Sequence, residues 1–218
     1  MGREVNLVRA LSKTKRNISA REDAKDLEVV RISKQFGQMY FDGPRDYGYG
    51  GYRYDGRWVP VAHDIIDHFD LKPGMRVLDA GCAKGFLVKD LRDACPGLEV
   101  IGLDISAYAI ENAHPDAKPF LVQGTIEAMP FDRPFDAVLC LDTVHNLPRD
   151  RAKTALREIQ RLSNGRAYVR VDSYNTPEQK AVFESWVLTA EFHDYPEGWL
   201  ALFAEAGYTG DYSWTIIE

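Results

Sequence analysis

Two short apolar runs, each with an acid at or next to its end, stand out in the pattern of apolar and polar positions. Val77–Ala80 carries its acid next to last, and Val100–Asp104 ends in one. Between the two runs lie the glycine-rich residues Gly81–Gly85 and an amphipathic stretch, Phe86–Ala94. Strand, glycine turn, helix, strand and acid follow one another in βαβ units that bind nucleotides. The pattern therefore predicts such a unit at the centre of the chain.

The rest of the chain alternates in the same way between predicted strands and predicted helices. Apolar runs predict further strands over Pro119–Gln123, Phe135–Leu141, Arg166–Asp172, Val187–Phe192 and Tyr212–Ile217. Helical periodicity predicts helices over Val59–Leu71, Ile105–Ala113, Arg151–Leu162 and Pro196–Ala206, a helical start over Thr176–Val182, and mostly helix over Glu4–Phe36. Strands that alternate with helices indicate an α/β domain with a parallel sheet.

One stretch fits neither pattern. Tyr40–Trp58 is rich in tyrosine, glycine and arginine, and so much glycine is incompatible with regular structure. A long loop inside a compact domain is usually functional or disordered, and the many rings here argue against disorder. We expect a lid whose rings either pack on the core or line a substrate pocket. The predicted division is an N-terminal extension with this lid (1–58) and one domain (59–218).

Composition narrows the class of protein. The chain has 218 residues, 45% of them hydrophobic, enough for one good core. A net charge of −6 argues against a nucleic-acid partner, and no apolar run reaches the roughly 18 residues needed to cross a membrane. Cys82, Cys95 and Cys140 show no metal-binding spacing. The N-terminus lacks the apolar core of a signal peptide, so we expect a cytoplasmic protein. We also expect no bound metal, and a monomer or a homodimer.

The glycine turn differs from that of dinucleotide enzymes. Their G-x-G-x-x-G pattern would need glycines where Ala83 and Phe86 stand. Instead the pattern is Asp79-x-Gly81-x-x-x-Gly85, which suits a ligand with an ammonium group and a ribose. The sequence VLDAGCAKG resembles motif I of the class I S-adenosylmethionine-dependent methyltransferases, and Asp104 matches the acid that holds the ribose in that family.

This resemblance covers roughly 59–218 and implies a fold. The expected architecture is Rossmann-like, with helices on both faces of a seven-stranded, mostly parallel sheet in the order 3-2-1-4-5-7-6 and the last strand antiparallel. Within the family, the sequences GYGGYRYDGRW and GYTGDYSW resemble small enzymes of bacterial capsule and natural-product pathways.

The resemblance also implies that S-adenosylmethionine is the cofactor and that the carboxyl edge of the sheet holds it. Gly124–Phe131 resembles the family segment that reads the adenine edge, where an acid often replaces Thr125. Adenine recognition then rests on the backbone of Ile126 or on Glu127. The implied cofactor-binding residues are Asp79, Ala80, Gly81, Gly85, Asp104, Ile105, Thr125, Ile126, Glu127 and Leu141.

Asp142–Leu147 matches the fourth motif of the family, which lies beside the transferable methyl. Within it, His145 is the best candidate for a general base, because histidine titrates near neutrality. A histidine that only orients the loop by a hydrogen bond is an equal alternative. Asp142 and Asp172 are weaker catalytic candidates. The expected substrate-binding residues are Tyr49, Tyr52, Arg53, Tyr54, Arg57 and Trp58 of the lid, with Asn146, Tyr174 and His193 at the sheet edge.

The expected function is methyl transfer from S-adenosylmethionine to an oxygen or nitrogen of a small polar metabolite. An arginine of the lid would pair with a carboxylate or phosphate of that acceptor. Three alternatives remain open: attack within the aminobutyrate part of the cofactor, sensing of the cofactor without turnover, and methylation of RNA or protein. The acidic composition makes the last of these the weakest.

Overall fold

The computed structural model describes residues 2–11 and 25–216. In this part of the chain, six parallel strands form one sheet in the order β3-β2-β1-β4-β5-β6. Their bounds are β1 Arg76–Ala80, β2 Glu99–Asp104, β3 Leu121–Gln123, β4 Ala137–Leu141, β5 Ala167–Ser173 and β6 Asp211–Ile216. The predicted βαβ unit is β1, α5 (Phe86–Ala94) and β2, with Val77 paired to Val100 in register. The α/β Rossmann-like fold that the sequence predicts is confirmed.

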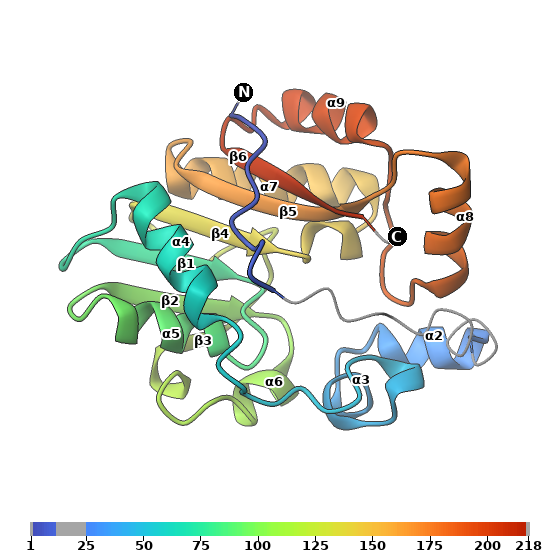
Figure 1. The fold of residues 1–218 in the computed structure, drawn as a ribbon, viewed down its shortest axis with the longest axis horizontal. Coiled ribbons are helices and arrows are strands. Elements are labelled where there is room, and N and C mark those ends of the chain that lie inside the picture. The colour runs from blue at the N-terminus through green and yellow to red at the C-terminus, as the bar shows by residue number, and fades with distance from the viewer. Residues whose placement is uncertain (1, 12–24, 217–218) are drawn as a thin grey trace.

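Helices cover both faces of the sheet (Figure 1). On one face, α4 (Val59–Phe69) and α5 share an apolar cluster with β1 and with Leu7 and Val8 of the N-terminal segment. On the other face, α7 (Arg149–Ser163) and α9 (Pro196–Ala206) pack on β4 and β5. Central strands with apolar cover on both sides read as continuous apolar runs, which is why β1 and β4 were visible in the sequence.

The expected seventh strand is wrong for the described residues, and so is the antiparallel last strand. Val187–Phe192 is irregular, and the amides of Glu191 and Phe192 donate instead to the backbone oxygen of His145, at 2.9 and 3.1 Å. After β5 the chain forms α8 (Pro177–Trp186) and then α9, which crosses the sheet and brings the chain back parallel to β5. A helical crossover is the usual connection between parallel strands, so β6 runs parallel.

The N-terminal segment lies at the outer edge of β6. Glu4 forms a bridge with Tyr212, and the amides of Val5 and Tyr212 are bonded to the oxygens of Tyr212 and Arg3. The mostly helical prediction for 4–36 therefore fails at 4–11, which form this bridge and a turn. Part of that prediction, 12–24, lies outside the described residues.

Two short helices, α2 (Leu27–Ser33) and α3 (Gln38–Asp42), and the 3-10 turn η1 (Arg45–Tyr47) lie beyond the carboxyl ends of the strands (Figure 1). The side chain of Asp26 caps α2 by accepting from the amide of Val29. We call residues 36–58 the cover segment, because they lie over the edge of the sheet where the predicted site residues gather. Among the described residues, no helix has the length and apolar character that crossing a membrane requires.

Candidate functional site

The glycine turn after β1 lies against the end of β2 and against the loop after β4. The amides of Gly81 and Cys82 both donate to the oxygen of Leu103, at 2.7 and 3.1 Å. Gly81 has φ +94°, and a Cβ there would lie 2.1 Å from the Thr143 hydroxyl oxygen. Only glycine fits both the left-handed conformation and this close approach. The turn thereby joins the predicted motif I to the predicted fourth motif.

Asp104, at the end of β2, is held by two backbone amides. Its Oδ2 accepts from the amide of Ala83 at 2.7 Å, and its Oδ1 accepts from the amide of Ser106 at 2.8 Å. Burial raises the pKa of Asp104, while these two hydrogen bonds act in the opposite direction. The carboxylate is thus fixed in orientation at the rim of the turn, and each of its oxygens keeps a further lone pair for a ligand hydroxyl.

Asp79, in the middle of motif I, is only 4% exposed. Its carboxylate has no hydrogen-bond or ion-pair partner among the described residues. Burial, reinforced by the negative charge of Asp104, raises the pKa of Asp79 to about 7. A buried carboxylate is costly unless it is paired, so this position favours a cation supplied by a ligand.

A cavity of about 730 Å³, including its open mouth, lies over this edge of the sheet. Of the predicted site residues, the cavity is lined by Tyr49, Gly81, Asp104, Ile105, Thr125, Ile126, Leu141, Asp142 and Asn146. Its other lining residues are Phe36, Tyr40, Phe41, Ala83, Gly124, Thr143 and Leu147. Ala80 is fully buried in β1, and Gly85, with φ +73°, precedes α5.

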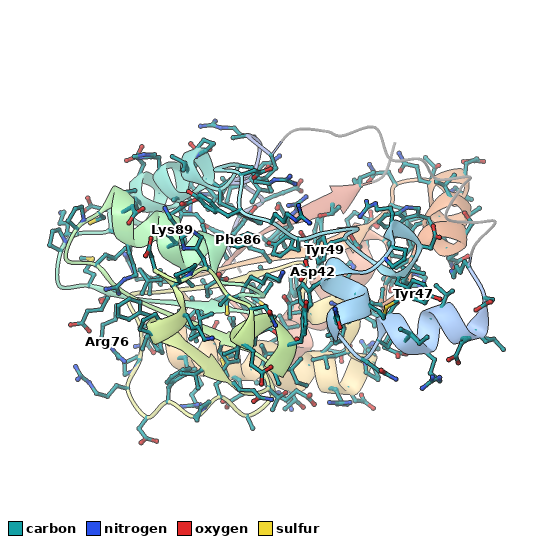
Figure 2. The ribbon with its side chains drawn as sticks, turned by 90° about the horizontal axis from the view of Figure 1, so that it is seen from below. Asp42, Tyr47, Tyr49, Arg76, Phe86 and Lys89 are labelled. Carbon is teal, nitrogen blue, oxygen red and sulfur yellow. The ribbon has the colours of Figure 1, made fainter. Side chains whose placement is uncertain are left out.

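Aromatic rings of the cover segment form one wall of the cavity. Tyr40 lies edge-on to Phe36 and to Tyr49, with ring centroids 5.2 Å apart in both pairs. Phe41 is 3% exposed and stacks on Tyr49 at 5.8 Å. Figure 2 shows Tyr49 near Asp42 in the middle of the molecule, whereas Tyr47 lies further out. The sequence predicted that rings would face the pocket, but it did not single out Phe36, which lies before the predicted lid.

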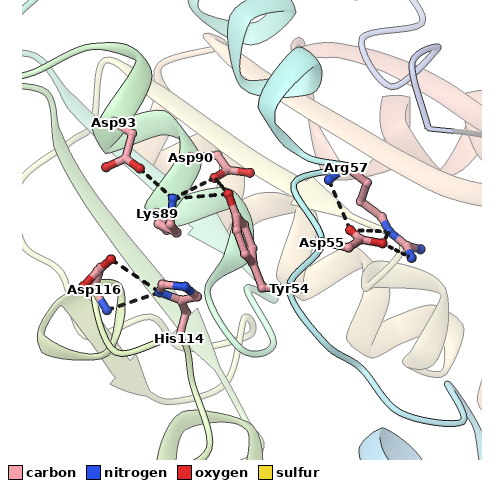
Figure 3. A network of polar contacts seen from close by, with 8 residues as sticks. All are labelled: Tyr54, Asp55, Arg57, Lys89, Asp90, Asp93, His114 and Asp116. Atoms are coloured by element: carbon pink, nitrogen blue, oxygen red, sulfur yellow. Dashed lines mark hydrogen bonds and ion pairs between the residues drawn. The ribbon is translucent and has the colours of Figure 1, made fainter.

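Most of the other predicted lid residues lie outside the cavity. Tyr52 stacks on Phe86 at 4.8 Å, and Trp58 packs beside α4. The Tyr54 hydroxyl donates to Asp90 at 2.7 Å, and Lys89 lies 3.2 Å from it (Figure 3).

The arginines of the cover segment do not face the cavity either. Arg57 forms a bidentate pair with Asp55 (Figure 3), and Arg45 donates to the oxygens of Gly48 and Tyr49. Arg53 is exposed. None of these three side chains is placed to pair with an anion inside the cavity, contrary to the expectation from the sequence.

The predicted adenine-reading segment is divided between the cavity and the surface. Thr125 and Ile126 line the cavity. Glu127 instead pairs with Arg151 of α7, with 2.7 Å between Oε1 and Nε, and accepts from the Thr125 hydroxyl at 3.2 Å. These hydrogen bonds, Arg151 first, lower the pKa of Glu127. The sequence left two groups open for adenine recognition, the backbone of Ile126 and the side chain of Glu127. Ile126 lines the cavity and Glu127 is engaged by Arg151, so Ile126 is the better placed of the two.

Asp142 follows β4 and lines the cavity in a left-handed conformation, with φ +52°. Its Oδ1 accepts from the Thr215 hydroxyl at 2.8 Å, and its Oδ2 lies 3.3 Å from Nη1 of Arg170. Asn146 also lines the cavity. Its Nδ2 donates to the backbone oxygen of Asp142 at 3.3 Å, and its Oδ1 is buried without a partner among the described residues.

His145 lies behind this loop and does not line the cavity. It is 4% exposed, its Nδ1 accepts from the amide of Asp172 at 3.0 Å, and its Nε2 lies 3.4 Å from the Asp172 carboxylate. Both ring nitrogens are thus engaged by Asp172, also a predicted catalytic residue. This geometry matches the alternative in which His145 orients the loop.

Tyr174 and His193 form a separate cluster at the end of β5. The Tyr174 hydroxyl lies 3.0 Å from Nδ1 of His193, and Phe183 packs on both rings. Burial raises the pKa of Tyr174 to about 12 and lowers the pKa of His193. Neither residue lines the cavity. The described residues contain no group of three or more His, Cys, Asp or Glu side chains that could hold a metal.

Comparison with known proteins gives this arrangement a family. Residues 77–165 match the family described as "Methyltransferase domain". The chain carries a class I S-adenosylmethionine-dependent methyltransferase domain. The matched range begins in β1 and ends just after α7, so it contains the glycine turn, Asp104 and the fourth motif.

The relatives of this methyltransferase domain modify different kinds of atom. The botryococcene C-methyltransferase of Botryococcus braunii is 29% identical over 74% of this chain, but this chain spans only 48% of its length. The magnesium-protoporphyrin O-methyltransferase of Synechocystis is 31% identical over 43% of each chain. The solved structure of that Synechocystis enzyme, magnesium protoporphyrin IX methyltransferase with bound SAH, superposes with a TM-score of 0.55 at 20% identity, covering 78% of this chain and 86% of the other. At this identity the superposition supports the fold.

Proposed function

We propose that the protein transfers the methyl group of S-adenosylmethionine to an oxygen or nitrogen atom of a small polar metabolite. The observation that carries this proposal is the pair of acids at the glycine turn. Asp79 is buried without a partner, which suits the ammonium group of the donor, and Asp104 is oriented by two amides, which suits its ribose hydroxyls. The exposed Ile105 and the backbone at Ile126 border the space that an adenine would occupy.

The residues of the chain position the reactants rather than activate them. A methyl on a sulfonium is already a reactive electrophile, so alignment of the nucleophile with the carbon–sulfur bond supplies most of the acceleration. The loop after β4, held against the glycine turn by the contact of Thr143 with Gly81, borders the same cavity as Asp104. The aromatic wall of the cover segment would exclude water from the methyl group.

Product analysis tests the proposal. Calorimetric titration of the full chain with S-adenosylmethionine should show binding, and incubation with a metabolite extract should convert the donor to S-adenosylhomocysteine with a gain of one methyl in an acceptor. Release of methylthioadenosine instead would support the alternative reaction on the aminobutyrate side. Binding without any product would support a sensor, and labelling of RNA or protein would overturn the small-molecule acceptor.

A further inference from the structure

The cavity holds negative charge that no lining cation balances. Two of its lining residues are carboxylates, Asp104 and Asp142, and none is a lysine, arginine or histidine. One cation does reach it from behind: Arg170, on β5, lies 3.3 Å from Asp142. An acceptor that brings a carboxylate or phosphate would therefore find no lining cation among the described residues to pair with and would lie near the carboxylates of Asp104 and Asp142.

Outside the ribose site, Asp142 is the one lining residue in the described part of the chain that could take a proton from the nucleophile, and its carboxylate is already engaged by Thr215 and Arg170. His145 is turned away and engaged by Asp172 at both ring nitrogens. The phenol of Tyr49 stays protonated and cannot accept the proton, because the neighbouring Tyr40, burial and the charge of Asp142 hold its pKa well above the ordinary value. An alcohol acceptor needs such a base before it can attack. A neutral amine does not, since its lone pair is already free.

The aromatic lining of the cavity suits a cation. Phe36, Tyr40, Phe41 and Tyr49 line the cavity together, and the electron-rich faces of such rings attract ammonium groups within about 6 Å. Asp142 accepts one hydrogen bond from Thr215 and faces Arg170, and a carboxylate has about four acceptor sites, so it keeps capacity for an N–H donor.

We infer that the acceptor is a small amine, whose nitrogen lies between Asp142 and the aromatic wall formed by Tyr40 and Tyr49. The neutral nitrogen uses its lone pair to form a bond to the methyl carbon, the carbon–sulfur bond breaks, and its electron pair stays on sulfur. The products are S-adenosylhomocysteine and an N-methylammonium ion, which then gives its proton to water. The positive charge moves from sulfur to nitrogen and stays beside the rings and the carboxylate throughout. This inference rests on the proposed function.

The test compares three probes of similar size on the full chain saturated with S-adenosylhomocysteine: benzyltrimethylammonium, benzyl alcohol and benzoate. Titration calorimetry should show the ammonium probe binding at least about tenfold more tightly than the other two. Benzoate or benzyl alcohol binding as tightly as the ammonium probe would overturn the inference, and so would an ammonium probe that does not bind. Because the S-adenosylhomocysteine titration comes first, failure at that step identifies a failure of the proposed function instead.

Two variants locate the effect. Tyr49→Leu removes a ring and should weaken the ammonium probe about threefold to tenfold, within the range of cation–π contacts. Tyr47→Leu, in the same segment but outside the cavity, is the matched control and should leave binding unchanged.

Asp142→Asn fits the left-handed backbone and still accepts from Thr215, but leaves Arg170 unpaired. It should therefore shift preference from the ammonium probe toward benzoate; an unchanged preference would contradict the role of Asp142.

Discussion

The ammonium of Lys84 lies 2.6 Å from a carboxylate oxygen of Asp42, and the pair joins the glycine turn to the cover segment. Lys84 is 6% exposed, so the ion pair is shielded from water on its side. The same carboxylate oxygen accepts from the Tyr108 hydroxyl at 2.7 Å. Although burial acts in the opposite direction, these contacts lower the pKa of Asp42. The residue that follows Ala83 in motif I therefore holds the cover segment in place.

Loss of this ion pair should loosen the cover segment. Lys84→Met removes the cation and with it a charge-assisted hydrogen bond to Asp42, a kind of contact worth roughly 1.5–3 kcal/mol. We expect faster trypsin cleavage after the exposed Arg53 and weaker binding of S-adenosylhomocysteine, measured by gel and by calorimetry. Lys72→Met is the control, because Lys72 forms only an exposed pair with Asp70. Equal cleavage of Lys84→Met and the unmodified protein would show that the pair does not hold the segment.

Cofactor binding should protect the same bond in the unmodified protein. Five glycines from Gly43 to Gly56 make this segment costly to order, at roughly 1–2 kcal/mol of backbone entropy for each residue fixed. Contacts of Tyr40, Phe41 and Tyr49 with a bound ligand would offset that cost, so closure should be coupled to binding. Saturating S-adenosylhomocysteine should slow cleavage after Arg53. Identical cleavage with and without ligand would indicate a rigid wall.

Replacement of Asp104 should weaken the cofactor without unfolding the chain. Asp104→Ala removes charge-assisted hydrogen bonds worth roughly 1.5–3 kcal/mol, which lowers affinity for S-adenosylhomocysteine at least about tenfold. Gly81→Val should be more severe, because its Cβ would collide with Thr143 at a left-handed position. Calorimetry measures both, and circular dichroism checks folding. Unchanged affinity in a folded Asp104→Ala would reject the ribose assignment.

Asp79 should make both stability and cofactor affinity depend on pH. Its pKa in the folded protein is about 7, well above the ordinary 3.8, so the folded protein retains a proton that the unfolded chain has lost. The free energy of unfolding should consequently fall as pH rises from about 4 to about 7. Affinity for an ammonium-bearing ligand should rise toward and above pH 7, as the carboxylate ionises.

Asp79→Asn should remove both trends, and Asp67→Asn, an exposed carboxylate on α4, should remove neither. Denaturant titrations and calorimetry at several pH values make the comparison. If both pH trends persist in Asp79→Asn, they arise from a group other than Asp79.

His145 should matter more for stability than for proton transfer. His145→Ala removes the acceptor for the amide of Asp172 and leaves that buried donor unsatisfied, which costs about 1–3 kcal/mol of unfolding free energy. His63→Ala, an exposed change on α4, serves as the control. The pH profile of turnover should keep its shape. A loss of roughly 10²–10⁴ in turnover together with loss of the low-pH limb would restore His145 as the base.

The parts of the fold that follow from local pattern could be predicted, and those that depend on distant partners could not. The β1–α5–β2 unit was visible because apolar runs, glycines and an acid lie within about thirty residues. Val187–Phe192 has the composition of a strand, but its amides bond to the loop at His145, over forty positions away. The strand propensity of a segment gives no information about such a distant contact.

The site shows the same division. Asp79, Gly81 and Asp104 could be named from their spacing, whereas the direction in which the ring of His145 points is set by Asp172 on the next strand. The pairing of Asp42 with Lys84 likewise joins two residues that no sequence motif connects.

The way the cover segment is attached has a kinetic consequence. Before the cover segment in the sequence, Leu7 and Val8 are buried in the same apolar cluster as α4. At the end of the cover segment, Trp58 leads directly into α4. A segment joined at both ends stays close to its site when it opens, at an effective concentration of the order of millimolar. Its closing is then a unimolecular step, so the rate of re-closing should not depend on the concentration of the protein.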